Sequence, residues 1–153
     1  MSTIDERLAE LGITLPTVVS PVAAYVPAVI TGNLVYTSGQ LPMVDGALPA
    51  TGKLGAAVSD EQGKALARQC ALNALAAVAS VIGSLDRVTR IVKVVGFVAS
   101  DAGYTGQPGV INGASEILGE IFGDAGVHAR SAVGVAVLPL DSPVEVELIV
   151  EFA

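Results

Sequence analysis

The stretch ARSAVGVAVLPLDSPVEVELIVEF, residues 129–152, contains two runs in which apolar residues alternate with other residues. Alternation with a period of two is typical of strands that pack one face of a sheet against a core. The runs 129–138 and 143–152 are separated by the sequence PLDS, 139–142, which is rich in turn-forming residues. The stretch therefore predicts a final β-hairpin.

The two faces of the predicted hairpin differ in side-chain size. On the second run, large apolar residues share the core face, and glutamates dominate the other face, with Glu145 the first of them. On the first run, the core face is assigned to the set Ser131, Val133, Val135 and Val137. The opposite face then carries the set Arg130, Ala132, Gly134 and Ala136. Because small residues allow another backbone to approach closely, we expect a second subunit to cover this face, with Arg130 at its rim.

Length and composition predict one domain, residues 1–153, with a substantial core. The chain is 52 % hydrophobic but only 4 % aromatic, and this hydropathy favours extra burial through oligomerisation. No uninterrupted apolar run reaches the roughly 18 residues of a membrane span. The acidic, amphipathic N-terminus lacks the pattern of a secretory signal. We therefore expect a cytoplasmic protein.

Charge and cysteine content limit the function classes. The net charge is −7, and the eight Lys and Arg residues form no cluster. Nucleic-acid binding relies on such residues to neutralise phosphates, so no nucleic-acid partner is expected. The single cysteine, Cys70, excludes a disulfide within the chain. It lies in a helical pattern without an evident basic neighbour, so a buried structural thiol is favoured over a catalytic one.

Turn signals and periodicity locate the other elements. Ser59 and Gln62 have the spacing of a capping box, Pro108 suits the first turn of a helix, and Pro27 restricts its strand to a sheet edge or bulge. We expect, in order, a short helix at 3–11, an extended segment at 13–21, strands at 22–30 and 34–38, a helix at 59–82, a strand at 87–100 and a helix at 108–122. The order ββαβαββ predicts an α+β fold: a mixed sheet with both long helices on one face and the other face uncovered.

Three segments outside the hairpin could carry function. The strand end Thr37-Ser38-Gly39 could turn backbone groups toward a ligand, but taken alone it is better interpreted as an ordinary transition from strand to loop. Asn73, near the apolar stripe of its helix, is interpreted as a structural hydrogen-bonding residue. His128, the only histidine, could be a general base, but no Ser, Cys or carboxylate stands at a recognisable spacing from it.

Taken together, several motifs resemble the reactive-intermediate deaminases of the RidA or YjgF type. The motifs are YVPAVITGNLVYTSGQLP (25–42), Asn112 early in the last helix, ARSAVGVAVLP (129–139) and VEVEL (144–148), and the resemblance spans residues 20–152. It implies a fold similar to trimeric bacterial chorismate mutase, a homotrimer with a central β-barrel, and sites in the clefts between subunits. Residues 1–20 would form an N-terminal extension.

The resemblance also implies a reaction, the hydrolysis of small imines or enamines such as 2-aminoacrylate to 2-oxo acids and ammonia. No metal or organic cofactor is needed, because an imine carbon is already electrophilic. Arg130 would hold the substrate carboxylate through its planar fork, and Glu145 would orient water and shuttle a proton. The other implied contacts are the backbone groups around Ser38 and Gly39 and the side chains of Tyr25 and Asn112.

Alternatives remain open at this level. Ala132 stands where typical deaminases carry a cysteine, and the loop at 50–58 is longer, so the substrate could differ. The same cleft could serve a non-catalytic trimer that binds small carboxylates, or Arg130 could pair with a carboxylate of a neighbouring chain. Endoribonuclease activity is disfavoured by the charge, and chorismate mutase activity by the single arginine. A symmetric hairpin would place Arg130 opposite Glu151 and about 20 Å from Glu145, so Arg130 and Glu145 could meet only across an interface.

Overall fold

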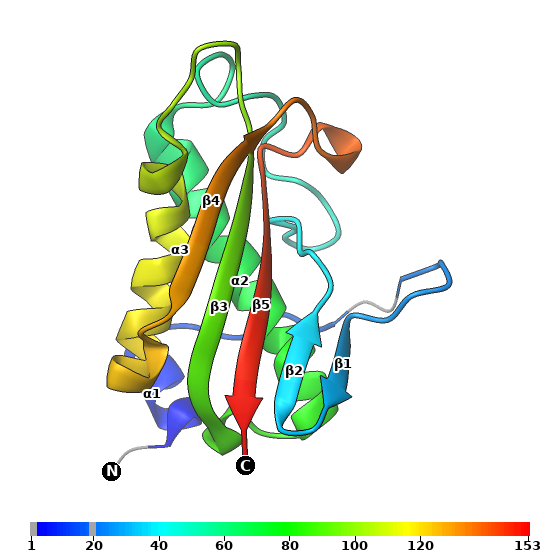
Figure 1. Cartoon of the computed structure of the whole chain (residues 1–153), viewed down its shortest axis with the longest axis vertical. Coiled ribbons are helices and arrows are strands. Elements are labelled where there is room, and N and C mark those ends of the chain that lie inside the picture. The colour runs from blue at the N-terminus through cyan, green and yellow to red at the C-terminus, as the bar shows by residue number, and fades with distance from the viewer. Residues whose placement is uncertain (1–2, 19–20) are drawn as a thin grey trace.

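Two long helices lie on one face of a five-stranded sheet in the computed structural model, which describes residues 3–18 and 21–153 (Figure 1). The helices are α1 (Ile4–Glu10), α2 (Asp60–Ile82) and α3 (Gln107–Phe122), and the 3-10 turns are η1 (Leu85–Arg87), η2 (Gly123–Gly126) and η3 (Pro139–Asp141). The strands are β1 (Ala28–Thr31), β2 (Leu34–Thr37), β3 (Val88–Ala99), β4 (Ala129–Val135) and β5 (Val144–Phe152). The predicted α+β fold and its ββαβαββ order are confirmed.

The predicted final hairpin is wrong. The sheet order is β1-β2-β5-β3-β4, so β3 separates β4 from β5. β4 pairs with β3 in parallel, and β5 lies antiparallel between β2 and β3. The physical reason is that α3 forms a crossover between β3 and β4, and such a crossover joins parallel strands. Residues 136–143 then carry the chain past the end of β3, with Leu140 and Asp141 at φ 59° and 58°.

The predicted faces of residues 129–135 are inverted. Arg130 stands beside the buried Val94, and Ala132 beside Gly96. A side chain at Gly96 would overlap Ile111 of α3, so this row points toward the helices. The small residues of β4 therefore make room for the chain's own helix rather than for another subunit. The alternating set that begins with Ser131 lies on the open face, where Val133 is 45 % exposed.

Local signals place the other elements to within one residue at their ends, except that the strand predicted at 22–30 begins only at Ala28, so its prediction over 22–27 is wrong. β1 begins only after Pro27, which has no N–H to donate to a ladder, and it forms one edge of the sheet as predicted. Thr3 caps α1 in a capping box with Glu6, and Ser59 caps α2 in the predicted one with Gln62. Of the extended segment predicted at 13–21, residues 19 and 20 lie outside the described residues.

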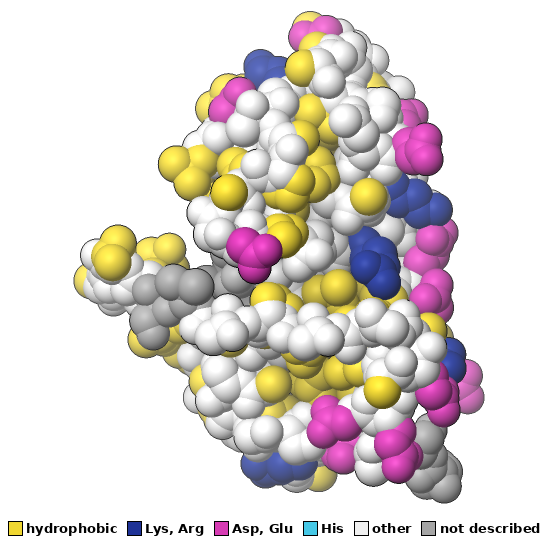
Figure 2. Space-filling model, turned by 180° about the vertical axis from the view of Figure 1, so that it is seen from behind, with side chains coloured by type: hydrophobic (Ala, Val, Ile, Leu, Met, Phe, Trp, Pro, Cys, Tyr) yellow, Lys and Arg dark blue, Asp and Glu magenta, His cyan; other side chains and the backbone are white. Residues whose placement is uncertain are grey.

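The core lies between the sheet and the two long helices. The predicted stripes are buried: Ala67, Ala71, Leu75, Val78 and Ile82 on α2, and Val110, Ala114, Ile117 and Ile121 on α3. By length and composition alone α2 could span a membrane, but 61 % of its most apolar window is buried inside the protein, so it is a core helix here. Seen from the helix side, Lys and Arg side chains lie among Asp and Glu side chains (Figure 2).

Cys70 belongs to this core, as predicted. Its thiol is fully buried and lies 3.7 Å from the carbonyl oxygen of Val144. Burial, and then the charge of Glu145, raise the pKa of the Cys70 thiol well above its ordinary value. The thiol therefore stays protonated and unreactive at neutral pH.

Candidate active site

Arg130 is held against α3 by hydrogen bonds through one of its terminal nitrogens. Nη1 donates to Oδ1 of Asn112 at 2.8 Å and to Oγ of Ser115 at 3.3 Å. The side chain is half-buried at the edge strand β4. Among residues 3–18 and 21–153 no carboxylate forms a salt bridge with it. Two residues that the sequence assigned to one site, Arg130 and Asn112, are thus brought together.

Ser115 and His128 extend this group, although the sequence motifs gave neither of them a place in the site. Oγ of Ser115 lies 2.8 Å from Nε2 of His128, and Nδ1 of His128 lies 2.6 Å from the carbonyl oxygen of Gly126. Spacing carried a signal for both residues. Asn112 and Ser115 are three apart on a helix, and His128 and Arg130 are two apart at a strand, so each pair shares a face.

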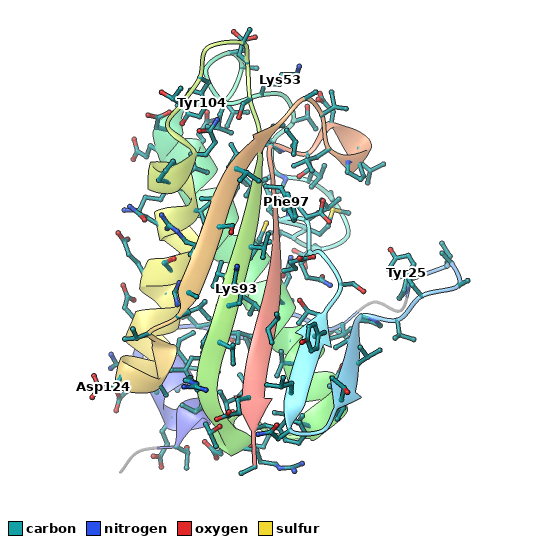
Figure 3. The ribbon with its side chains drawn as sticks, viewed as in Figure 1. Tyr25, Lys53, Lys93, Phe97, Tyr104 and Asp124 are labelled. Atoms are coloured by element: carbon teal, nitrogen blue, oxygen red, sulfur yellow. The ribbon has the colours of Figure 1, made fainter. Side chains whose placement is uncertain are left out.

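Glu145 lies on the open face of the sheet, beside the end of β2. Its side chain fills the space where a side chain of Gly39 would be, so only glycine fits at position 39 without displacing the carboxylate. Burial raises the pKa of Glu145, and the charge of Glu147 raises it further. The register partner of Glu145 on β3 is Phe97, which lies with Lys93 on this face (Figure 3).

A cavity of about 680 Å³ opens beside Gly39. Its walls are the loop after β2, part of α2 and the segment before β1. The lining residues are Pro16, Thr17, Val18, Pro21, Val22, Tyr25, Pro27, Gly39, Gln40, Leu41, Met43, Asp45, Gly46, Asn73 and Ala76. Asn73 donates to the carbonyl oxygens of Leu41 and Met43, which fits its predicted structural role. Tyr25 and Gly39, both predicted site residues, therefore share one cavity.

Ser38 has a different role from the one expected. Its hydroxyl donates to the carbonyl oxygen of Val26, and its amide donates to that of Pro27 at 2.8 Å. These two bonds attach the segment that carries Tyr25, which is 59 % exposed and projects away from the sheet (Figure 3). A ligand contact at this strand end would therefore come from Gly39 or from the carbonyl group of Ser38.

Within one chain the two groups of predicted site residues do not meet. Arg130 is level with Val94, and Val94 with Leu148, three residues from Glu145. Two strand spacings and three residues separate the Cα atoms of Arg130 and Glu145 by roughly 14 Å, and the side chains point to opposite faces. This distance between Arg130 and Glu145 replaces the one estimated from a hairpin. In the structure Glu151 accepts a hydrogen bond from Thr89 and does not lie opposite Arg130.

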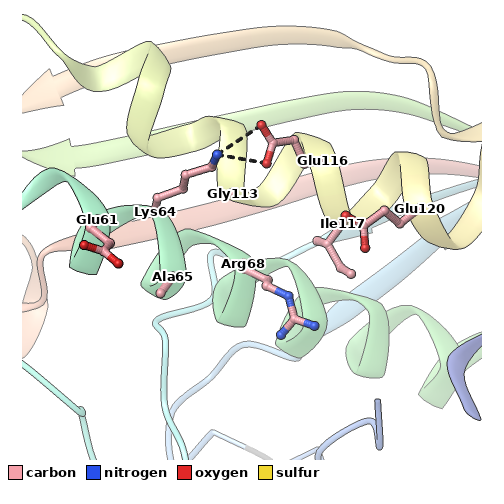
Figure 4. Close-up of a pocket in the computed structure, with 8 residues that line it drawn as sticks. All are labelled: Glu61, Lys64, Ala65, Arg68, Gly113, Glu116, Ile117 and Glu120. Carbon is pink, nitrogen blue, oxygen red and sulfur yellow. Dashed lines mark hydrogen bonds and ion pairs between the residues drawn. The ribbon is translucent and has the colours of Figure 1, made fainter. Parts of the chain in front are cut away.

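A second, smaller hollow lies between α2 and α3 (Figure 4). It measures about 240 Å³ and is lined by Glu61, Lys64, Ala65, Arg68, Gly113, Glu116, Ile117 and Glu120. Lys64 and Glu116 form an exposed salt bridge of 3.0 Å across it. Gly113 lets the two helices approach so closely that a side chain there would overlap the backbone of Lys64. This hollow is a packing feature of the helix layer.

Comparison with known proteins places the chain and its fold in one family. The family model described as "YjgF/chorismate mutase-like, putative endoribonuclease" matches residues 5–152. The chain therefore belongs to the YjgF/chorismate mutase-like family. The match includes most of the N-terminal extension, which the sequence resemblance had left out.

Individual relatives agree with this assignment. Protein TCP17 of Trypanosoma cruzi is 45 % identical over 97 % of this chain and 93 % of its own length. The crystal structure of Atu1372 from Agrobacterium tumefaciens has a TM-score of 0.91 at 45 % identity, over 98 % of this chain and 92 % of that one. The structure of a "putative endoribonuclease" from Shewanella oneidensis has a TM-score of 0.95 at 36 % identity, over 99 % and 100 % of the two chains.

A more distant structural neighbour has an amino acid bound to it. The structure of TdcF from E. coli with bound serine has a TM-score of 0.65 at 27 % identity. The match covers 92 % of this chain and 96 % of TdcF.

Proposed function

We propose that this protein hydrolyses small imines or enamines derived from amino acids, releasing ammonia and a 2-oxo acid. The observation that carries the proposal is the state of Arg130. Its guanidinium is fixed through Nη1 to Asn112 and Ser115, and among the described residues Nη2 and Nε have no partner. The Nη2–Nε edge is a planar pair of donors that matches a carboxylate. The serine bound to the related TdcF supports an amino-acid carboxylate as the ligand class.

The site is proposed to form between subunits of a homotrimer. Arg130 lies on the edge strand β4, with Asn112 of α3 bonded to it. Glu145, Gly39 and Tyr25 lie toward the opposite edge of the sheet, which β1 forms. The open face carries exposed apolar residues such as Val29, Tyr36 and Val133, which a neighbouring sheet would cover. One chain would then contribute the carboxylate-binding half of each cleft and its neighbour the half with Glu145.

In the proposed reaction, Arg130 binds the carboxylate and Glu145 handles the proton. Water adds to the carbon of the protonated imine as one of its protons passes to the Glu145 carboxylate, and a neutral carbinolamine forms. Glu145 then returns that proton to the amine nitrogen, and the C–N bond breaks as the carbinolamine hydroxyl gives its proton to the Glu145 carboxylate, so that the oxygen of the water becomes the 2-oxo group. Ammonia leaves and takes the last proton from Glu145 as ammonium. The raised pKa of Glu145 suits this exchange, because a carboxyl group whose pKa is shifted toward neutral pH both accepts and returns a proton more readily than an exposed one.

The test is ammonia and pyruvate release from 2-iminopropionate generated in the assay by an amino-acid oxidase. The wild-type protein should accelerate release, and Arg130→Ala should abolish the acceleration while the oligomer stays intact. Arg130→Lys, which keeps the charge but loses the planar fork, should retain only a small part of the activity. A folded wild-type protein that accelerates release from none of several amino-acid imines would refute the proposal.

A second candidate is a trimer that binds small carboxylates without catalysis. The structure of TdcF with bound serine favours it, because that complex shows an amino acid held by a relative. Calorimetry would then show saturable, Arg130-dependent binding of serine or pyruvate by a protein that turns nothing over.

Endoribonuclease activity, a third candidate, enters through the descriptions of the family and of the Shewanella neighbour. The net charge of −7 and the interspersed charges on the helix side do not favour RNA (Figure 2). RNA cleavage that survives both Arg130→Ala and repeated purification would support it.

A further inference from the structure

A chain of hydrogen bonds runs from Arg130 to the backbone at the end of α3. It passes from Nη1 of Arg130 to Oγ of Ser115 at 3.3 Å, and from Oγ to Nε2 of His128 at 2.8 Å. It ends at the carbonyl oxygen of Gly126, 2.6 Å from Nδ1 of His128. The proposed chemistry uses neither Ser115 nor His128, yet both are half-buried and aligned with the residue it depends on.

The direction of each bond follows from what the two ends can do. A carbonyl oxygen only accepts, so Nδ1 of His128 carries a hydrogen. In the neutral ring Nε2 then has a lone pair, and the Ser115 hydroxyl donates to it. The remaining lone pairs of that oxygen accept from Nη1 of Arg130, which cannot accept in return. Every donor therefore points one way, from Arg130 through Ser115 and His128 to Gly126.

Both hydrogens of Nη1 are used in this arrangement. One goes to Oδ1 of Asn112, and the other goes to Oγ of Ser115. Two acceptors at one terminal nitrogen fix the orientation of the guanidinium plane. A single acceptor would leave the plane free to turn about that one hydrogen bond. The edge formed by Nη2 and Nε is then presented in a single orientation.

We propose that Ser115 and His128 are positioning residues, which fix the guanidinium plane of Arg130 for a carboxylate. The part concerning the carboxylate rests on the proposed function. His128 acts only through Ser115: its ring, anchored at Gly126, keeps Nε2 as an acceptor and so orients the hydroxyl. Ser115 acts directly on Nη1 and shares that atom with Asn112.

The positioning role requires the ring in the form whose Nε2 accepts the hydrogen of the Ser115 hydroxyl. If the ring were protonated, Nε2 and Nη1 would both point hydrogens at one oxygen, and the hydroxyl would lose its acceptor.

The first test reads the ring directly and needs no ligand. Because His128 is the only histidine, nitrogen NMR of the labelled wild-type protein gives one imidazole. We expect the neutral ring to carry its hydrogen on Nδ1, the less common tautomer in water. The guanidinium signal of Arg130 is identified as the one that is missing from the spectrum of Arg130→Lys. We also expect Ser115→Ala to speed rotation of that guanidinium. A ring with its hydrogen on Nε2, or a rotation rate unchanged in Ser115→Ala, would overturn the proposal.

The second test measures binding of pyruvate by calorimetry. Ser115→Ala and His128→Ala should each weaken binding by about tenfold, the scale of one hydrogen bond to a charged group. Ser115→Thr keeps the hydroxyl and should stay within about threefold of wild type by the same reasoning. Ser80→Ala is the matched control, because that helical hydroxyl bonds only to the carbonyl oxygen of Ala77.

The outcomes separate the two proposals. Pyruvate binding that is equally strong in Ser115→Ala and wild type overturns the positioning role, even where ammonia release is intact. If Ser115→Thr binds pyruvate as weakly as Ser115→Ala does, the positioning role is overturned too, because the effect then does not depend on the hydroxyl group. Binding that follows this pattern without any imine turnover supports the positioning role and refutes the proposed hydrolysis.

Discussion

A methyl group at Gly39 is the most direct way to move Glu145 without changing its charge. The Cβ atom of an alanine there would lie 2.8 Å from Cδ and 3.1 Å from Cγ of Glu145. Ordinary contacts begin at 3.4 Å, so the carboxylate carbon must retreat by at least the difference from 2.8 Å, about 0.6 Å. The backbone at Gly39 is outside the left-handed region, so alanine itself is tolerated.

The expected consequence is a loss of rate with little loss of stability. Misplacing a catalytic group by about 1 Å can cost on the order of a hundredfold in rate, so Gly39→Ala should lower kcat for imine hydrolysis by about ten- to a hundredfold. The displaced group is the far end of a flexible side chain. The free energy of unfolding should therefore change by less than about 1 kcal/mol.

The assay pairs kcat for ammonia release with urea unfolding of the same preparations. Gly109→Ala is the matched control, because a methyl group there meets no atom within 4 Å. It should leave kcat at the wild-type value. A folded Gly39→Ala protein with wild-type kcat would refute the role assigned to Glu145, because its carboxylate would have moved without effect.

Two further predictions concern charge and packing. Glu147→Gln removes a like charge that raises the pKa of Glu145, so that pKa should fall. Since activity needs the carboxylate and is lost as pH falls through its pKa, the acidic limb of the pH–rate profile should move to lower pH, and an unmoved limb would contradict this. Gly113→Ala should destabilise the protein by about 1–3 kcal/mol through overpacking against Lys64. Urea unfolding measures this loss, and Gly119→Ala, where space is open, should cause none.

The sequence predicted those features that depend on residues close together in the chain. Each of these features acts within a single helix: on α2 the cap at Ser59 and the buried stripe that includes Leu75, and on α3 the proline in its first turn. Pro27 likewise marked an edge strand, because a missing N–H is a property of that residue alone. Arg130 and Asn112 could be assigned to one site only through the family resemblance, since no local rule joins a strand to a preceding helix.

The sequence reasoning failed in the pairing of β4 and β5, which are not neighbours in the sheet. Pro139 and Asp141 are turn-forming residues, but a turn does not say whether the next strand lies beside the last one or beyond another. The alternation in 129–135 shows two faces without naming the buried one, because both are apolar. Size would have decided it: α3 packs where Gly96 and Ala132 leave room, so the row of small residues is the inner one.

The placement of Arg130 and Glu145 on opposite faces of the sheet leads to a test of the shared site. Arg130→Ala and Glu145→Gln should each be inactive alone. In the proposed trimer each cleft takes Arg130 from one chain and Glu145 from the next. Unfolding the two variants together in equal amounts and refolding them should therefore give about one quarter of the clefts both intact residues, and a similar fraction of wild-type activity. Mixing without refolding is the control. No recovery in mixed trimers would mean that both residues act from the same chain, which their positions on the sheet do not allow, and the proposed cleft would have to be abandoned.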